Sequence, residues 1–243
     1  FSIVRWQQFG ALTANLHGSL DGMPVDDRRY HIDMTHLLDE PLQIVRPFFG
    51  ESDLTYMAQV GAGLRRLIQR RLPLTKPYYG CIHGDITNVH SDRDGRMVLF
   101  DFDCYGYGWR AYEISVVLWL LECAAYGHGL KRGWVQRRWG AFQKGYNSVR
   151  NISASERAAI TWFVPLRHIW VMALQARTVG FRGRNSVNFD QGIAFIRRWI
   201  NRHRLQDIVQ CATWASGCSA RSSKRTTSKP GLAATQTSTD VAR

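Results

Sequence analysis

Residues 82–112 decide how this chain folds, and they read IHGDITNVHSDRDGRMVLFDFDCYGYGWRAY. In the middle of this stretch, Asp94-Gly95 is a strong signal for a tight turn, and the mainly apolar residues 96–100 beyond it are typical of a strand. The stretch therefore predicts a β-hairpin. If the strands pair symmetrically about the turn, Asn88 and Asp101 face each other across neighbouring strands, which lie about 4.8 Å apart.

The hairpin brings together side chains that offer oxygen ligands. One ion could contact both Asn88 and Asp101, because Mg²⁺ takes oxygen ligands at about 2.1 Å and completes its octahedron with waters and phosphate oxygens. Asp85 lies three residues before Asn88 and is expected beside that ion. A carboxylate there can accept the proton of an attacking hydroxyl group and orient it in line with a terminal phosphate. The pattern indicates a magnesium-dependent phosphoryl-transfer site.

At these residues the chain resembles the aminoglycoside phosphotransferase and choline kinase superfamily, whose members are relatives of the protein kinases and phosphorylate small molecules. Members carry His-Gly-Asp followed by an Asn and then, beyond a hairpin, Asp-x-Asp. In one branch the second motif continues Phe-Asp-Phe-Asp-Cys-x-Gly-x-Gly-Trp-Arg-Ala-Tyr, and residues 100–112 match it. The segment Phe9–His17 also looks like the helix that opens the second lobe in this family, so the resemblance spans Phe9–Tyr126.

The resemblance implies a role for each acid and amide of the two motifs. Asp85 would be the catalytic base, and His83 would brace the loop that carries it. Asn88 and Asp101 would be the Mg²⁺ ligands, with Asp103 as an auxiliary acid near the metal. Asp103 could instead be a carboxylate that only stabilises the glycine-rich turn after it. The resemblance further implies ATP as co-substrate and a small molecule with a hydroxyl group as the acceptor.

The residues that follow the second motif allow two interpretations. Trp109, Arg110 and Tyr112 could form the floor of a substrate pocket, or they could simply pack the next helix. Glu113 stands where many relatives have Asp, and we expect it to brace the catalytic loop.

One departure from the family pattern lies in the loop itself. Here only Ile86 and Thr87 separate Asp85 from Asn88, whereas the family usually has four residues between the Asp and the Asn. Either Asn88 is the ligand on a shortened loop, or the register is kept and His90 takes the amide position, where a neutral imidazole would bind Mg²⁺ poorly. We favour Asn88.

A second departure concerns nucleotide binding. Kinases of this type hold ATP under a glycine-rich loop and pair its phosphates with a lysine from a preceding strand. Neither element precedes His83: Gly61-Ala62-Gly63 lies in an apolar helical repeat, where close helix packing or a kink explains it better, and Lys76 lies in a proline-flanked loop. Since the sequence also begins at Phe1, we expect a kinase-like C-terminal lobe without its N-terminal lobe. A truncated or degenerate kinase-like protein without activity is the open alternative.

The predicted fold is α+β and mostly helical, with one small sheet, the hairpin, that carries the site. Helices are expected at Val4–Leu16, Asp53–Leu72, Tyr112–Tyr126, Lys131–Ser148, Ala154–Val179 and Phe189–Thr213. We expect the kinase-like lobe to cover residues 1–214. From Ala215 onward Ser, Thr, Ala, Lys and Arg dominate without apolar periodicity, which predicts a disordered basic tail over residues 215–243.

Composition limits the other possibilities. A hydrophobic content of 45% in 243 residues supports a sizeable core. No stretch reaches the roughly 20 apolar residues that span a bilayer, and the apolar run 114–126 is expected to be a buried helix. The five cysteines are scattered without a Cys-x-x-Cys pair, so free thiols in a reducing cytoplasm are the simplest interpretation.

Two other functions compete with phosphoryl transfer onto a hydroxyl group. Haloacid-dehalogenase phosphatases also follow an apolar strand with Asp-x-Asp, but they need a later lysine and a closely spaced acidic pair, and the downstream acids here are isolated. The net charge of +13 would suit a nucleic-acid-binding module. No recognised nucleic-acid motif accompanies that charge, so we expect no specific nucleic-acid partner.

Overall fold

The computed structural model describes residues 2–23, 28–182 and 188–207 of the chain. The α-helices are α1 (Ile3–Asp21), α2 (Glu40–Val45), α3 (Glu51–Arg71), α4 (Arg110–Gly127), α5 (Arg132–Asn147), α6 (Ala154–Arg182) and α7 (Phe189–Arg202). Short π or 3₁₀ turns lie at η1 (Thr35–Asp39), η2 (Arg46–Phe48) and η3 (Phe102–Cys104). The strands are β1 (His31–Ile32), β2 (Tyr79–Ile82), β3 (Val89–Ser91), β4 (Met97–Leu99) and β5 (Gly106–Trp109). The mostly helical α+β prediction is confirmed.

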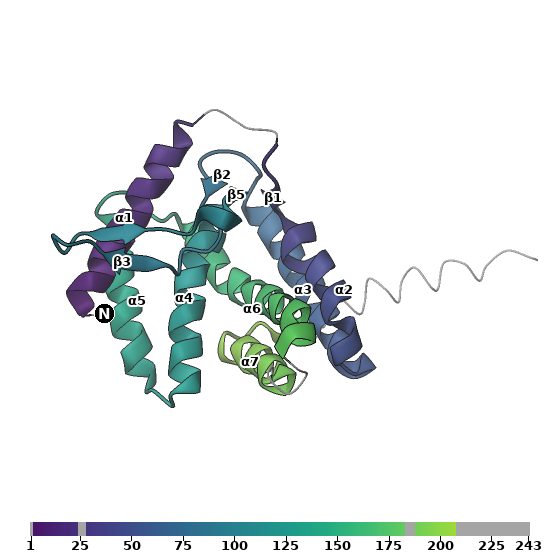
Figure 1. The fold of residues 1–243 in the computed structure, drawn as a ribbon. Coiled ribbons are helices and arrows are strands. Elements are labelled where there is room, and N and C mark those ends of the chain that lie inside the picture. The colour runs from purple at the N-terminus through teal and green to yellow at the C-terminus, as the bar shows by residue number, and fades with distance from the viewer. Residues whose placement is uncertain (1, 24–27, 183–187, 208–243) are drawn as a thin grey trace, which may run out of the picture.

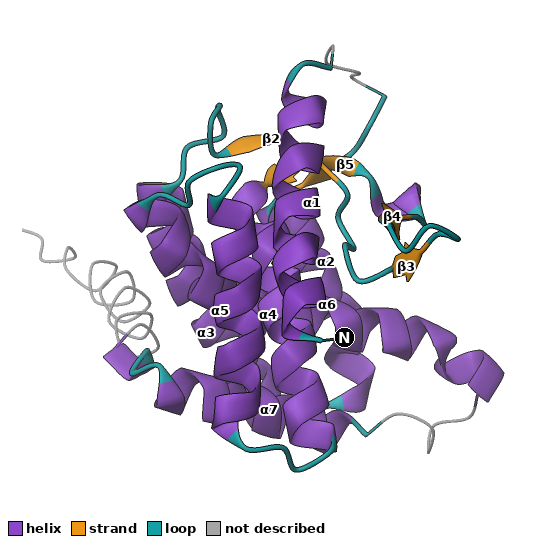
Figure 2. Cartoon of the chain, turned by 90° about the vertical axis from the view of Figure 1, so that its left-hand side faces the viewer, coloured by secondary structure: helices purple, strands orange, loops and turns teal. Residues whose placement is uncertain are grey.

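The long helices pack against one another, the sheet of β1, β5 and β2 lies toward one end of them, and the β3-β4 hairpin lies beside α1 (Figures 1 and 2). Helix α1 packs chiefly on α5, and α4 packs chiefly on α6. Helix α4 is largely buried: Ile114, Val116 and Val117 are fully buried. The predicted burial of the apolar run 114–126 holds for most of the run, but Tyr126 at its end is 39% exposed. Among the described helices, none has both the length and the apolar character needed to cross a bilayer.

The expected helices are present, with shifted ends. Helix α1 continues to Asp21 instead of Leu16, and α4 begins at Arg110, directly after strand β5. Helix α7 ends at Arg202, and the remainder of the predicted helix beyond residue 207, like the predicted tail 215–243, lies outside the described residues. Close packing at Gly61 is also confirmed, because a Cβ there would lie 2.8 Å from Cδ2 of Leu38.

The prediction of a single small sheet was wrong. A three-stranded sheet of order β1-β5-β2 accompanies the two-stranded β3-β4 hairpin. Strand β5 reads Gly-Tyr-Gly-Trp, and glycine has a low strand propensity, which is why the pattern escaped prediction. Packing nevertheless favours glycine here, because a Cβ at Gly106 would lie 2.7 Å from the backbone carbonyl oxygen of Tyr30.

The hairpin is present, but its register differs by one residue from the predicted pairing. Val89 pairs with Leu99 and Ser91 with Met97, so the turn centres on Asp94, and Phe100 rather than Asp101 lies opposite Asn88. The cause is the side chain of Asp92, whose Oδ1 accepts the backbone N–H groups of Asp94 and Arg96 and closes a wider turn.

The α1–α5 contact depends on glycine, and this gives a first testable prediction. A Cβ at Gly145 would overlap with the backbone carbonyl of Gln7, so Gly145→Ala should force the helices apart and lower the free energy of unfolding by about 1–3 kcal/mol. Gly140 lies on the same helix with nothing near its Cβ position. Gly140→Ala should therefore raise stability by about 0.5–1 kcal/mol. Thermal unfolding of both variants tests this, and a Gly145→Ala protein as stable as Gly140→Ala would contradict it.

Candidate active site

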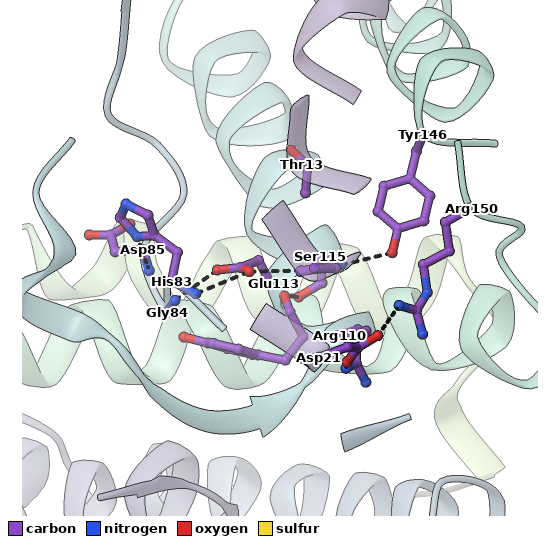
Figure 3. Close-up of polar contacts among 12 residues, drawn as sticks. Thr13, Asp21, His83, Gly84, Asp85, Arg110, Glu113, Ser115, Tyr146 and Arg150 are labelled. Atoms are coloured by element: carbon purple, nitrogen blue, oxygen red, sulfur yellow. Dashed lines mark hydrogen bonds and ion pairs between the residues drawn. The ribbon is translucent and has the colours of Figure 1, made fainter. Parts of the chain in front are cut away.

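The loop that follows strand β2 is held in place by hydrogen bonds to one buried carboxylate (Figure 3). Glu113, in the first turn of α4, is fully buried. Its Oε2 accepts the backbone N–H of His83 at 3.1 Å, and its Oε1 accepts that of Gly84 at 2.7 Å. Nε2 of His17, from α1, lies 2.8 Å from Oε2. The carboxylate therefore joins the loop to two helices, which agrees with the bracing expected of Glu113.

The same loop is held against the segment after the hairpin. Gly84 has φ of +83°, and a Cβ there would overlap with the carbonyl oxygen of Cys104, so glycine is required by both conformation and contact. His83 Nε2 lies 3.1 Å from the carbonyl oxygen of Phe100, a distance that suits donation from the ring N–H. The imidazole also packs on Phe102, with ring centroids 4.3 Å apart. His83 thus links the two predicted motifs.

Asp85 lies at the open side of this loop, with one of its carboxylate oxygens engaged. Oδ1 accepts a hydrogen bond from Nη2 of Arg167 at 2.6 Å and another from the hydroxyl of Thr87 at 3.1 Å. From the described residues, Oδ2 accepts no hydrogen bond. A quarter of the Asp85 side chain is exposed, so this oxygen can be reached by another molecule.

Asn88 and Asp101 lie together despite the shifted register. Nδ2 of Asn88 donates to Oδ2 of Asp101 at 2.8 Å. Asp101 has φ of 66°, a left-handed conformation that is uncommon for a residue other than glycine and that gathers at functional sites. His90, the alternative to Asn88, lies on β3 with its ring 4.6 Å from that of Phe100. Asp103, in η3, is exposed.

The side-chain oxygens of Asn88 and Asp101 fit a metal ion whose other ligands would be phosphate oxygens and waters. In the described ranges, no three His, Cys, Asp or Glu side chains gather closely enough to hold a metal ion. The amide and carboxylate of Asn88 and Asp101 are adjacent, and one amide with one carboxylate suffices for Mg²⁺, which keeps several waters and binds substrate phosphates. The pair therefore fits Mg²⁺ bound to a nucleotide.

The residues predicted to bind substrate or pack the next helix are buried. Trp109, Arg110 and Tyr112 are each at most 2% exposed. The Trp109 indole donates to the carbonyl oxygen of Leu72. Arg110 pairs with Asp21 and donates to the backbone (Figure 3), and burial, with a nearby arginine, lowers its pKa to about 10. These contacts favour packing at Trp109 and Arg110, whereas Tyr112 contacts the site indirectly through Arg167.

Sequence reasoning missed Arg167, which lies 82 residues from Asp85. It comes from the middle of α6 and is 2% exposed. Its guanidinium stacks over the rings of Trp170 and Trp119, with Cζ 4.6 and 5.2 Å from their centroids. The signal in the sequence was an arginine inside the mainly apolar run 162–170. Such a pattern indicates a buried charge, but it does not indicate which residue pairs with it.

Solved structures of small-molecule kinases share this fold. An amicoumacin kinase, hAmiN, in complex with AMP-PNP, Ca²⁺ and Ami has a TM-score of 0.60 at 22% identity, covering 86% of this chain and 59% of that one. A microcompartment-associated aminopropanol kinase has a TM-score of 0.61 at 22% identity, covering 86% and 64%. A choline/ethanolamine kinase family protein from Mesorhizobium loti has a TM-score of 0.59 at 12% identity, covering 86% and 65%.

Curated proteins also match this chain by sequence. An uncharacterised protein of Deinococcus radiodurans is 34% identical over 203 residues, 80% of this chain and 57% of that protein. The amicoumacin kinase of Bacillus subtilis is 28% identical over 139 residues, 56% of this chain and 41% of that protein. The chain therefore spans about half the length of the curated relatives it matches.

The phosphotransferase enzyme family matches residues 5–151, which is more than half of the chain. This match includes both motifs and the helix α1 segment. Together with the kinase structures above, it confirms the resemblance to the aminoglycoside phosphotransferase and choline kinase superfamily. The chain belongs to the phosphotransferase enzyme family.

Proposed function

We propose that this chain carries the site of an ATP-dependent enzyme that transfers the γ-phosphoryl group onto a hydroxyl group of a small molecule. The observation that carries the proposal is the placement of Asp85 on the same short loop as Asn88, whose amide meets the Asp101 carboxylate at 2.8 Å. One carboxylate oxygen of Asp85 accepts no hydrogen bond from the residues that the structure describes. Family membership and the kinases of similar fold support it.

In this proposal each residue of the site has a separate role. Oδ2 of Asp85 accepts the acceptor's hydroxyl proton and holds the oxygen in line with the terminal phosphate. Asn88 and Asp101 hold Mg²⁺, which neutralises charge on the phosphates when it is bound. His83 and Glu113 keep the loop in place, so catalysis is mainly positioning and electrostatic stabilisation.

The acceptor class is proposed from the kinases of similar fold. The names of the similar kinases include aminopropanol, choline and ethanolamine, which are small amino alcohols, and we propose an acceptor of that size. The net charge of +13 disfavours a polycation. A cytoplasmic location and the absence of a specific nucleic-acid partner, both inferred from the sequence, complete the proposal.

Thermal unfolding with and without MgATP tests the proposal. A ligand at about a hundred times its dissociation constant adds roughly 2.7 kcal/mol to stability, which corresponds to a rise in Tm of about 5–10 °C for a domain of this size. We expect a rise that requires Mg²⁺ and is lost in Asp101→Ala, because that variant removes the carboxylate next to Asn88.

The outcomes separate the alternatives. A magnesium-dependent rise justifies screening aminopropanol, ethanolamine and choline as acceptors by ADP release. A folded wild-type chain that shows neither a rise nor ADP release would contradict the proposal and favour a kinase-like protein without activity. A rise that persists unchanged in Asp101→Ala would place the nucleotide elsewhere.

A further inference from the structure

The contact between Asp85 and Arg167 ties the catalytic loop to a helix far from it in sequence. Nη2 of Arg167 lies 2.6 Å from Oδ1 of Asp85, and Nη1 donates to the hydroxyl of Tyr112 at 3.2 Å. Tyr112 is on α4 and Arg167 on α6. The guanidinium is thus fixed between two helices that pack on each other.

Burial makes this guanidinium rigid. The side chain is 3% exposed, with the rings of Trp119 and Trp170 against it. Removing a guanidinium from water costs several kcal/mol unless partners compensate, and here the partners are one carboxylate, one phenol and two aromatic faces. An arginine held in this way has a position that does not depend on the loop, so it gives the Asp85 carboxylate a fixed partner.

The geometry at Asp85 shows what that position achieves. Arg167 and Thr87 both donate to Oδ1, which fixes the rotation of the carboxylate and leaves Oδ2 on the exposed side. The two donors therefore fix the plane of the carboxylate, with one oxygen held by the protein and the other left open to an acceptor.

The short loop explains why such an anchor is needed. Only Ile86 and Thr87 separate Asp85 from Asn88, and the backbone N–H of Thr87 already bonds to the carbonyl oxygen of Asp85 in a tight turn. A loop of this length has few residues left to hold Asp85, and a displacement of about 1 Å can cost about a hundredfold in rate.

We infer that Arg167 is a positioning residue for Asp85: it fixes Oδ1 from helix α6 so that Oδ2 faces the acceptor hydroxyl. The inference rests on the proposed phosphoryl transfer. It assigns to α6, which carries none of the family motifs described above, a direct part in the geometry of the reaction.

A double-mutant cycle tests this inference, with ADP release from MgATP as the readout. Water serves as the acceptor in one series, and aminopropanol, ethanolamine and choline in another. We expect Arg167→Met to lower kcat by about 10–100-fold while the KM for MgATP stays within about twofold, since the Asn88–Asp101 pair is untouched. In the Asp85→Asn background the same change should matter by less than about threefold, because the two residues act as one unit.

Three further variants keep the test decisive. Arg167→Lys retains the charge but cannot contact Asp85 and Tyr112 together, so kcat should fall less than in Arg167→Met. Thr87→Val removes the second donor to Oδ1 from a half-buried site and should lower kcat without unfolding the chain. Arg202→Met is the matched control. Arg202 also lies on a helix and forms an ion pair of the same N–O distance, 2.6 Å to Glu122, and its replacement should leave kcat unchanged.

Each result has one meaning. Non-additive losses at Asp85 and Arg167 support the inference. Additive losses, or an Arg167→Met enzyme with unchanged kcat, overturn it while the proposed function stands. If Arg167→Met does not fold, the comparison of Arg167→Lys and Thr87→Val with Asp85→Asn decides in the same way. A folded wild-type chain that releases no more ADP than Asp101→Ala removes the proposed function, and the inference with it.

Discussion

Replacing Asp85 with asparagine is expected to slow phosphoryl transfer by about 10²–10⁴-fold, the contribution usual for a general base, while MgATP binding is retained. Asparagine has the same shape, and its Oδ1 can still accept from Arg167 and Thr87. Its amide nitrogen would take the place of Oδ2, however. An amide nitrogen donates a hydrogen bond and cannot accept the proton of the substrate hydroxyl group. Because Asp85 has no hydrogen bond to Asn88 or Asp101, the nucleotide site should be unaffected.

The measurement pairs ADP release with the MgATP-dependent thermal shift on the same preparations. Asp94→Asn is a matched control, since Asp94 lies in the hairpin turn, is 72% exposed and pairs with the exposed Arg96. The control should resemble the wild type in both assays. An Asp85→Asn protein that loses the thermal shift as well as the rate would show that Asp85 serves nucleotide binding rather than the acceptor.

Replacing Glu113 with alanine is expected to cause the largest loss of stability. The change leaves the backbone N–H groups of His83 and Gly84 and the ring of His17 without their shared acceptor. All of these groups are buried. Breaking a buried network of this kind costs about 3–5 kcal/mol, which corresponds to a fall in Tm of about 6–20 °C.

Chemical denaturation and hydrogen exchange together check this prediction. Glu113→Gln keeps the shape and one carbonyl acceptor, so its loss should be smaller, and the amides of His83 and Gly84 should exchange fastest in Glu113→Ala. Glu122→Ala is the control on the same helix, where Glu122 pairs with a partly exposed Arg202 and its removal should cost about 1 kcal/mol or less. Equal losses of stability at positions 113 and 122 would mean that the buried network contributes nothing beyond a partly exposed ion pair.

Local signals in the sequence were sufficient to predict the helices and the hairpin of this protein. The Asp94-Gly95 turn between apolar residues identified the hairpin, and apolar periodicity identified helices α1 and α3 to α7, because both patterns depend on neighbours within a few residues. The spacing of Asn88 and Asp101 about that turn placed their side chains together. A register shift of one residue, caused by Asp92, did not separate them, because the side chains reach further than the shift.

Contacts between distant residues could be decided only by the tertiary structure. The pairing of β1 with β5, the burial of Arg110 against Asp21, and the bonds from His17 to Glu113 and from Arg167 to Asp85 join positions up to 96 residues apart. No local pattern specifies such a partner, since a buried charge shows in the sequence only as a charged residue among apolar ones. The sequence predicted which groups would carry the proposed chemistry, and the packing of α1, α4 and α6 around one short loop decided how those groups are held.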